Sequence, residues 1–156
     1  MRHRLPNGLT VLAEENHAAP VSALQVWVRV GSADELPGEA GLAHLHEHML
    51  FKGTARRGPG EIARNIEGCG GEINAWTSFD QTVYHVVVAS QFLAQGMDVL
   101  ADAITSAAFD PEELRREIEV VCEECGQRAT YPGAQRGSVQ YCPHCYAHVD
   151  VESKNE

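Results

Sequence analysis

The segment Gly41 to Thr54, GLAHLHEHMLFKGT, carries side chains whose spacing suits metal chemistry. Because a helix turns by about 100° per residue, His44 and His48 would lie one turn apart on the same face, with Glu47 beside them. Two imidazoles at this spacing can hold one zinc ion, and the carboxylate can act on a zinc-bound water. His46 would lie about 200° around the helix from His44, so it should face away from the metal. The alternative is a surface helix rich in His and Glu.

The wider string GLAHxxEHMLFKGT resembles the metal-binding helix of the pitrilysin/insulinase family of zinc metallopeptidases, and H-x-x-E-H is the inverzincin signature. In that family a third ligand, a Glu, comes from a later E-x6-E segment. Here Glu117 and Glu124 form E-x6-E, and Glu124 follows His48 by 76 positions, as in the family. The resemblance implies that His44, His48 and Glu124 hold a catalytic zinc. It also implies that Glu47 is the general base and Glu117 a supporting carboxylate of the active site.

A second string, GGEINAWTSFDQTVYH, resembles the segment that follows the metal helix in the same family. There, an N-A-x-T strand lies at the sheet edge beside the zinc, and a peptide substrate adds to it as a further strand. The matching positions are Asn74, Ala75 and Thr77. Such binding depends on backbone hydrogen bonds, so it would tolerate many substrate sequences. The alternative is an ordinary edge or central strand.

Four of the five Cys residues form two C-x-x-C pairs separated by sixteen residues. This spacing is typical of a small β-rich zinc ribbon, so a structural zinc is predicted to bind the four thiolates of Cys122, Cys125, Cys142 and Cys145. Disulfide pairing is the weaker alternative, because we expect a reducing compartment. Cys69, in GCGG, is interpreted as an inert turn thiol.

The two predicted zinc sites share residues 122–125. A helix that carries Glu124 toward His44 and His48 would prevent the same residues from wrapping around a second metal. We therefore expect one catalytic and one structural zinc that compete for this segment. The predicted boundaries are a truncated peptidase-like α+β domain at 1–121, a zinc-ribbon-like module at 122–150 and a tail at 151–156.

Composition and charge exclude several classes of function. The formal net charge of −10 argues against a nucleic-acid-binding surface, since such surfaces neutralise phosphates with Lys and Arg. There is no apolar run long enough for a membrane span, and in MRHRLPNGLTVL polar residues return before an apolar stretch of the length found in export signals. We expect a cytoplasmic protein without a membrane segment.

The pattern of apolar and turn residues predicts an α+β fold, a mostly antiparallel sheet with helices packed on one face, plus a small C-terminal zinc ribbon. The strand at 21–30 is predicted to bury one face on which Val, Leu and Trp recur, and the helix at 92–107 a face with Leu93, Met97, Leu100 and Ile104. The predicted elements are a hairpin at 2–5 and 9–14, strands at 21–30, 72–77 and 82–89, and helices at 39–51, after Gly60, at 92–107 and from Asp110-Pro111.

The motifs together predict a zinc-dependent metalloendopeptidase domain that acts on a peptide or unfolded polypeptide. The resemblance covers residues 5 to about 124, whereas family members carry further elements and a second half-domain that closes over the substrate. It therefore implies an amino-terminal part that needs a second peptidase-like subunit or domain. Three origins of such a chain stay open: a natural fusion, a truncated reading frame or a degenerate relative of the family. The rival hypothesis is a non-catalytic zinc-binding or interaction module, in which the ribbon mediates contact and the peptidase-like part is a vestige.

Overall fold

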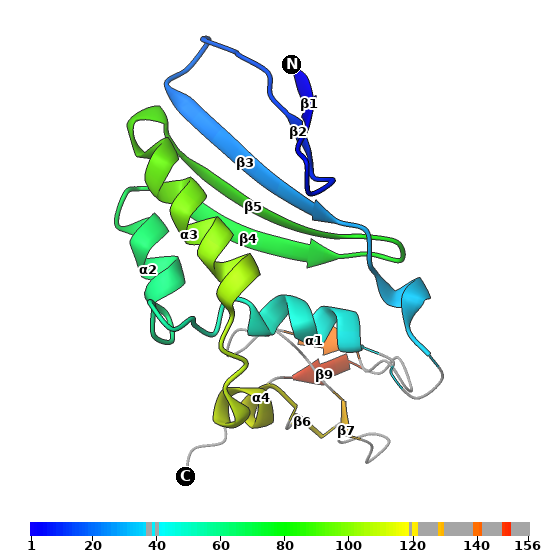
Figure 1. Cartoon of the computed structure of the whole chain (residues 1–156). Helices are drawn as coiled ribbons and strands as arrows, with labels where there is room; N and C mark the ends of the chain where they lie inside the picture. The colour runs from blue at the N-terminus through cyan, green and yellow to red at the C-terminus, as the bar shows by residue number, and fades with distance from the viewer. Residues whose placement is uncertain are drawn as a thin grey trace.

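The computed structural model of the chain describes residues 1–36, 39 and 41–118, and beyond them four short strands (Figure 1). Up to Ile118 the elements follow the predicted order β-β-β-α-α-β-β-α-α, with 3-10 turns at Ser32–Asp34 and Ser90–Phe92. The strands are β1 (Arg2–Arg4), β2 (Thr10–Leu12), β3 (Val21–Val28), β4 (Glu72–Thr77) and β5 (Thr82–Ala89). The helices are α1 (Leu42–Met49), α2 (Glu61–Glu67), α3 (Leu93–Ser106) and α4 (Pro111–Ile118).

A three-stranded antiparallel sheet in the order β3-β5-β4 forms the centre of the fold. The middle strand, β5, is the most buried of the three, as expected for a strand with neighbours on both sides. β4 is an edge strand of this sheet, and its exposed and half-buried residues alternate along its length. The sheet therefore has a helix-covered face and an open face.

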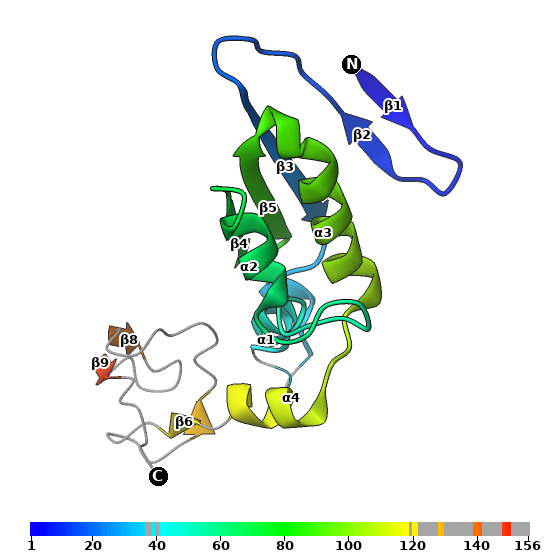
Figure 2. The same ribbon diagram turned by 90° about the vertical axis from the view of Figure 1, so that its left-hand side faces the viewer.

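Helices α2 and α3 pack on one face of the sheet, where they close the hydrophobic core (Figure 2). Gly96 brings α3 close to the strands, because an added Cβ there would lie 3.3 Å from the side chains of both Leu24 and Val86. The buried core residues are Leu50, Ile62, Ile66, Tyr84, Val86, Val88, Val99, Leu100 and Ala103. The antiparallel sheet with helices on one face confirms the α+β prediction for this part of the chain.

Two predicted apolar faces differ from the observed ones. Leu93 and Met97 are exposed on α3, and its buried face instead carries Gly96, Val99, Leu100, Asp102 and Ala103. The small side chains let the helix approach the sheet, and Asp102 is buried because it is hydrogen-bonded. On β3, Trp27 lies on the open face and not on the face of Leu24. There it packs edge to face against Trp76 of β4, with ring centroids 5.8 Å apart, and both rings flank Val83.

The predicted N-terminal hairpin is present as the pair β1 and β2, which lies apart from the three-stranded sheet (Figures 1 and 2). Its turn is stabilised by the Asn7 side chain, which accepts a hydrogen bond from the Leu9 backbone at 3.1 Å, and by Gly8 with φ of 93°. In the part of the chain that the structure describes, no helix has the length and apolar character needed to cross a membrane.

Beyond α4, β6 (Val120–Val121) pairs antiparallel with β7 (Arg128–Ala129), and β8 (Val139–Tyr141) pairs antiparallel with β9 (His148–Asp150). Each C-x-x-C pair falls between two paired strands in the sequence. Glu124 and the four Cys ligands themselves, Cys122, Cys125, Cys142 and Cys145, lie outside the described residues. The ribbon, its zinc and the domain boundaries at 121 and 150 stay predictions.

Candidate metal centre

The helix that carries the metal motif begins at Leu42, three residues later than the predicted start at 39. Gly41 precedes it with φ of 89°, a left-handed conformation that favours Gly. The side chain of Glu35 accepts hydrogen bonds from the backbone N–H groups of Gly41 at 2.9 Å and Ala43 at 2.8 Å. This cap comes from a residue outside the helix, so the local sequence pattern does not reveal where the helix starts.

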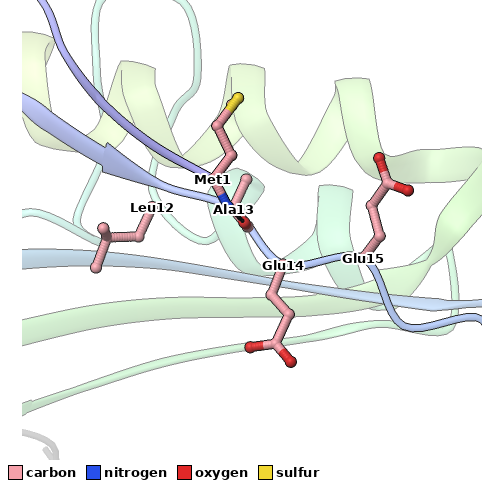
Figure 3. Close-up of a pocket in the computed structure, with 5 residues that line it drawn as sticks. All are labelled: Met1, Leu12, Ala13, Glu14 and Glu15. Carbon is pink, nitrogen blue, oxygen red and sulfur yellow. Dashed lines mark hydrogen bonds between the residues drawn. The ribbon is translucent and has the colours of Figure 1, made fainter.

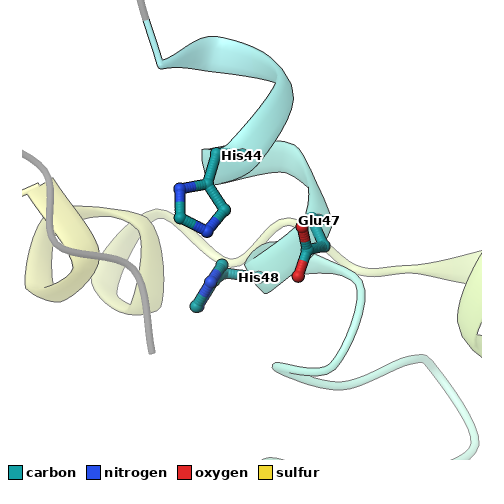
Figure 4. Close-up of side chains that lie close together, drawn as sticks. All are labelled: His44, Glu47 and His48. Carbon is teal, nitrogen blue, oxygen red and sulfur yellow. The ribbon is translucent and has the colours of Figure 1, made fainter. Parts of the chain in front are cut away.

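His44, Glu47 and His48 form a group whose potential ligand atoms all lie within 4.8 Å of one another (Figure 4). The two imidazole rings are 4.9 Å apart between centroids and nearly perpendicular, at 78°. His44 is exposed, His48 is half-buried and Glu47 is buried. Two imidazole nitrogens one helical turn apart are donors that suit zinc, and a carboxylate beside them suits a zinc-activated water, so the residues present fit this ion.

His48, on α1, lies close to charged side chains, one of which comes from α4. Its Nδ1 lies 3.7 Å from the Glu117 carboxylate, which also forms an ion pair with Lys52. Burial, with the charges of His44 and Lys52, lowers the pKa of His48 from 6.5 to about 4. The imidazole is therefore neutral near pH 7, the form that binds a metal. Lys52 was missed in the sequence; it follows His48 by four residues and lies just beyond the end of α1.

Glu47 points into the interior between α1 and the sheet, where its side chain is 5% exposed. Its Oε2 accepts a hydrogen bond from the Thr77 hydroxyl at the end of β4. On β5, burial together with the charge of Glu47 raises the pKa of the Tyr84 phenol. Glu47 is thus placed by a hydrogen bond from β4 as well as by its own helix.

A cavity of about 350 Å³ opens beside the three α1 residues and extends along β4. Asn74, Ala75 and Thr77, the predicted substrate-binding residues, all line it, together with His44, Glu47, His48, Phe51 and Trp76. The structure therefore brings the edge strand and the metal group to one place. Thr77 differs from the other two strand residues, because its side chain is bonded to Glu47.

Other parts of the described structure lack this combination of groups. His46 packs against Phe109, with ring centroids 5.2 Å apart, and does not join the metal group, as predicted. A hollow of about 730 Å³ beside the N-terminal hairpin is lined by exposed residues without His or Cys (Figure 3). Its lining residues are Met1, Leu12, Ala13, Glu14 and Glu15.

The loop that follows α1 is fastened to α3 by hydrogen-bonded charges. Asp102, 7% exposed, accepts hydrogen bonds from the Thr54 hydroxyl at 2.7 Å, from Arg56 at 3.1 Å and from Arg57. Asp98 pairs with the same two arginines. Nothing in the spacing of these residues indicated that they meet, because about 45 positions separate the arginines from the aspartates.

A family model described as Insulinase (Peptidase family M16) matches residues 10–136 of the chain. The match covers the metal helix, the edge strand and α4, and it continues past Glu124.

Relatives with similar sequences carry peptidase names. The chain is 41% identical over 121 residues to mitochondrial-processing peptidase subunit beta of Blastocladiella emersonii. This alignment covers 78% of this chain and 26% of that protein. It is 38% identical over 123 residues to the uncharacterized zinc protease YmxG of Bacillus subtilis, covering 79% of this chain and 30% of that protein. The chain thus spans less than a third of the length of these relatives.

A solved structure has the same fold. The crystal structure of a protease from Helicobacter pylori matches with a TM-score of 0.71 and 30% sequence identity. The match covers 76% of this chain and 29% of that one.

Proposed function

Because the chain belongs to the insulinase family, peptidase family M16, we propose that it forms the metal-binding part of a zinc-dependent metalloendopeptidase. The observation that carries the proposal is the group of His44, Glu47 and His48, which lines a cavity beside the edge strand β4. Zinc as the ion is supported by the donor set and by relatives that are named zinc proteases.

His44 and His48 would hold the zinc, with Glu124 as the third ligand. The family match, which runs past Glu124, supports its inclusion. Zinc bound there would polarise a peptide carbonyl and activate a water molecule for attack. Glu47 would accept the proton of that water and return it to the leaving amine. Glu117, 3.7 Å from His48, would orient that imidazole.

The substrate would be an extended peptide that adds to the sheet along β4, at Asn74, Ala75 and Thr77. The edge position of β4 and its place beside the metal group support this mode of binding, which needs free backbone groups on the edge strand. One relative is named as a subunit of a processing peptidase, which supports a second subunit or domain as partner. The cytoplasmic location stays a prediction.

The test combines zinc content with peptide hydrolysis, both measured on the full chain and on Glu47→Gln. The variant should keep its zinc, because both imidazoles remain, while hydrolysis falls about 10²–10⁴-fold as the proton acceptor is lost. Hydrolysis at the parent rate would show that Glu47 is not the base. Zinc binding without any hydrolysis by the parent would show that this chain is not a peptidase by itself, and would favour the non-catalytic candidate.

A non-catalytic zinc-binding module is the second candidate. The pairing of β6 with β7 and of β8 with β9 favours it, because each pair flanks a C-x-x-C in the sequence. In this proposal Cys122, Cys125, Cys142 and Cys145 hold a structural zinc, and the peptidase-like part is a vestige. The hydrolysis test separates the two candidates.

A further inference from the structure

Thr77 occupies a special position at the end of the edge strand. Along β4, Asn74 and Trp76 are exposed, whereas Ala75 and Thr77 are half-buried on the helix-covered face. The Thr77 side chain therefore points toward α1, where its hydroxyl donates a hydrogen bond to Glu47 Oε2. A peptide that adds to the edge of β4 would meet the Thr77 backbone, not this hydroxyl.

The neighbouring Thr82 hydroxyl determines which acceptor the Thr77 hydroxyl donates to. Thr82 Oγ1 lies 3.0 Å from the Val30 carbonyl oxygen, to which it donates its only proton. Thr77 and Thr82 are 3.4 Å apart, so Thr77 could donate either to Thr82 or to the nearer Glu47. A carboxylate is the stronger acceptor, and the Thr77 proton is therefore directed to Glu47.

The need for this hydrogen bond follows from the burial of Glu47. A carboxylate that is 5% exposed loses most of its contact with water, and its charge is stabilised only if other donors replace that water. Among the described residues, Thr77 is the only one whose side chain donates to Glu47. The bond holds Oε2 and leaves Oε1 as the oxygen available for proton transfer.

We propose that Thr77 is a positioning residue, whose hydroxyl fixes the orientation of the Glu47 carboxylate beside His44 and His48. The catalytic consequence rests on the proposed function, because it requires Glu47 to be the base. The hydrogen bond between Thr77 and Glu47 does not depend on the proposed function, so either one can be contradicted without the other.

The first experiment measures the hydrogen bond without catalysis, in a double-mutant cycle on the full chain. Thr77→Val removes the hydroxyl at nearly constant volume, and Glu47→Met removes its acceptor. Thr77→Val should lower the thermal midpoint by about 4 °C when Glu47 is present, and by less than about 1 °C in the Glu47→Met background. Thr105→Val, at an exposed hydroxyl bonded within α3, is the matched control and should show no such coupling. Equal losses in both Glu47 backgrounds would overturn the proposal.

The second experiment measures the consequence for catalysis in the zinc-loaded chain. Thr77→Val should lower kcat about tenfold to a hundredfold and change KM less than about twofold, because the peptide contacts the strand backbone. Thr77→Ser, which keeps a hydroxyl, should restore most of kcat. A merely structural tie would lower stability in Thr77→Val and leave kcat unchanged, and that result would also overturn the proposal.

A third outcome separates the two hypotheses. If the parent chain hydrolyses no peptide, the peptidase function fails for this chain, and the orientation of Glu47 is then decided by the cycle together with crystal structures of Thr77→Ser and Thr77→Val. We expect the Glu47 carboxylate to keep its orientation in the first and to rotate in the second. An unchanged carboxylate in Thr77→Val would contradict positioning.

Discussion

At the scale of single residues, α1 contains three His whose surroundings assign them different tasks. The ring centroids of His44 and His48 lie 4.9 Å apart, whereas the His46 ring packs against Phe109 on another side of the helix. Burial has already made His48 neutral near pH 7, so it needs to release no proton there to bind a metal.

This difference predicts the effect of two matched substitutions. His44→Ala should weaken zinc binding by more than about a hundredfold, because it removes a ligand and not only an outer hydrogen bond. His46→Ala should leave the affinity within about threefold, since the side chain contacts Phe109 and not the metal group. Isothermal titration with zinc measures both. A loss in His46→Ala as large as that in His44→Ala would show that the ligand pair is wrongly assigned.

The sequence predicted the members of the metal group because helical spacing is a local property. His44, Glu47 and His48 are close for the same reason in any helix. The contact between Thr77 and Glu47 could not be predicted in this way, since it depends on how the end of β4 meets α1 across thirty positions of sequence. Resemblance assigned Thr77 to substrate binding, and only the structure revealed its hydroxyl beside the Glu47 carboxylate.

At the scale of the element, the start of α1 depends on a residue that the helix does not contain. Glu35 accepts hydrogen bonds from Gly41 and Ala43, and it carries the negative charge that a helix N-terminus favours. His44 lies in the first turn of the helix, so fraying of that turn would move a proposed ligand.

Glu35→Ala is therefore expected to destabilise the fold by about 1–2 kcal/mol, the usual effect of losing a helix cap, and to weaken zinc binding as well. Glu67→Ala, at an exposed position on α2, is the control and should change neither quantity appreciably. Chemical denaturation measures the stability, and zinc titration the affinity. An unchanged zinc affinity in Glu35→Ala would show that the first turn is held by other contacts.

The ion pairs between the loop after α1 and α3 predict a dependence of stability on pH. Burial would raise the pKa of the Asp102 carboxyl, but hydrogen bonds from Thr54 and Arg57 outweigh it and hold that pKa below the usual 3.8. A lowered pKa in the folded state gives stability that is present above pH 3.8 and is lost as the pH falls below it.

Asp102→Asn should accordingly lower the free energy of unfolding by about 1–3 kcal/mol at pH 7, because it removes the negative charge and one of the two acceptor oxygens beside a largely buried Arg57. The difference from the parent should shrink as the pH falls below about 4. Urea denaturation at several pH values measures it, with the exposed Asp98→Asn as the comparison. A difference that persists unchanged at low pH would mean that the carboxylate charge is not what stabilises the loop.

The order of the elements was predictable, whereas the faces of two of them were not. Turn residues and periodicity depend on neighbours in sequence, which explains the agreement up to Ile118. The face of α3 that meets the sheet is chosen by close approach, and Gly96 and Ala103 allow it where Leu93 and Met97 would not. The face on which Trp27 lies was unpredictable for a similar reason. Its ring packs against Trp76, which belongs to another strand, so the sequence of β3 alone does not indicate this contact.

At the scale of the whole molecule, the two predicted zinc sites lie next to each other in sequence, and Glu124 lies between Cys122 and Cys125. α4 carries Glu117 to within 3.7 Å of His48 and is described as far as Ile118. Whether Glu124 joins the same site depends on whether the four Cys bind their own metal.

Changing Cys142 and Cys145 together to Ser should reduce the zinc content from two ions to one, because a module this small has little core without its metal. The remaining site at His44 and His48 should then bind zinc more tightly than in the parent, as Glu124 is freed to act as a ligand. Metal analysis and zinc titration measure the two effects.

Glu124→Gln in each background is the control for this prediction. It should lower zinc affinity strongly in the double Ser variant and little in the parent. Equal losses in both backgrounds would show that Glu124 binds the catalytic zinc while the Cys site is intact, and that the two sites do not compete.

The pair of Trp27 and Trp76 provides an intrinsic fluorescence probe within the chain. They are the two tryptophans of the sequence, they share one patch on the open face of the sheet, and Trp76 also lines the metal cavity. Their emission therefore originates from a single place, where separation of β3 from β4 and occupation of the cavity both change the surroundings of an indole ring. Intrinsic fluorescence can follow folding and ligand entry in the same sample, without a label that would disturb either.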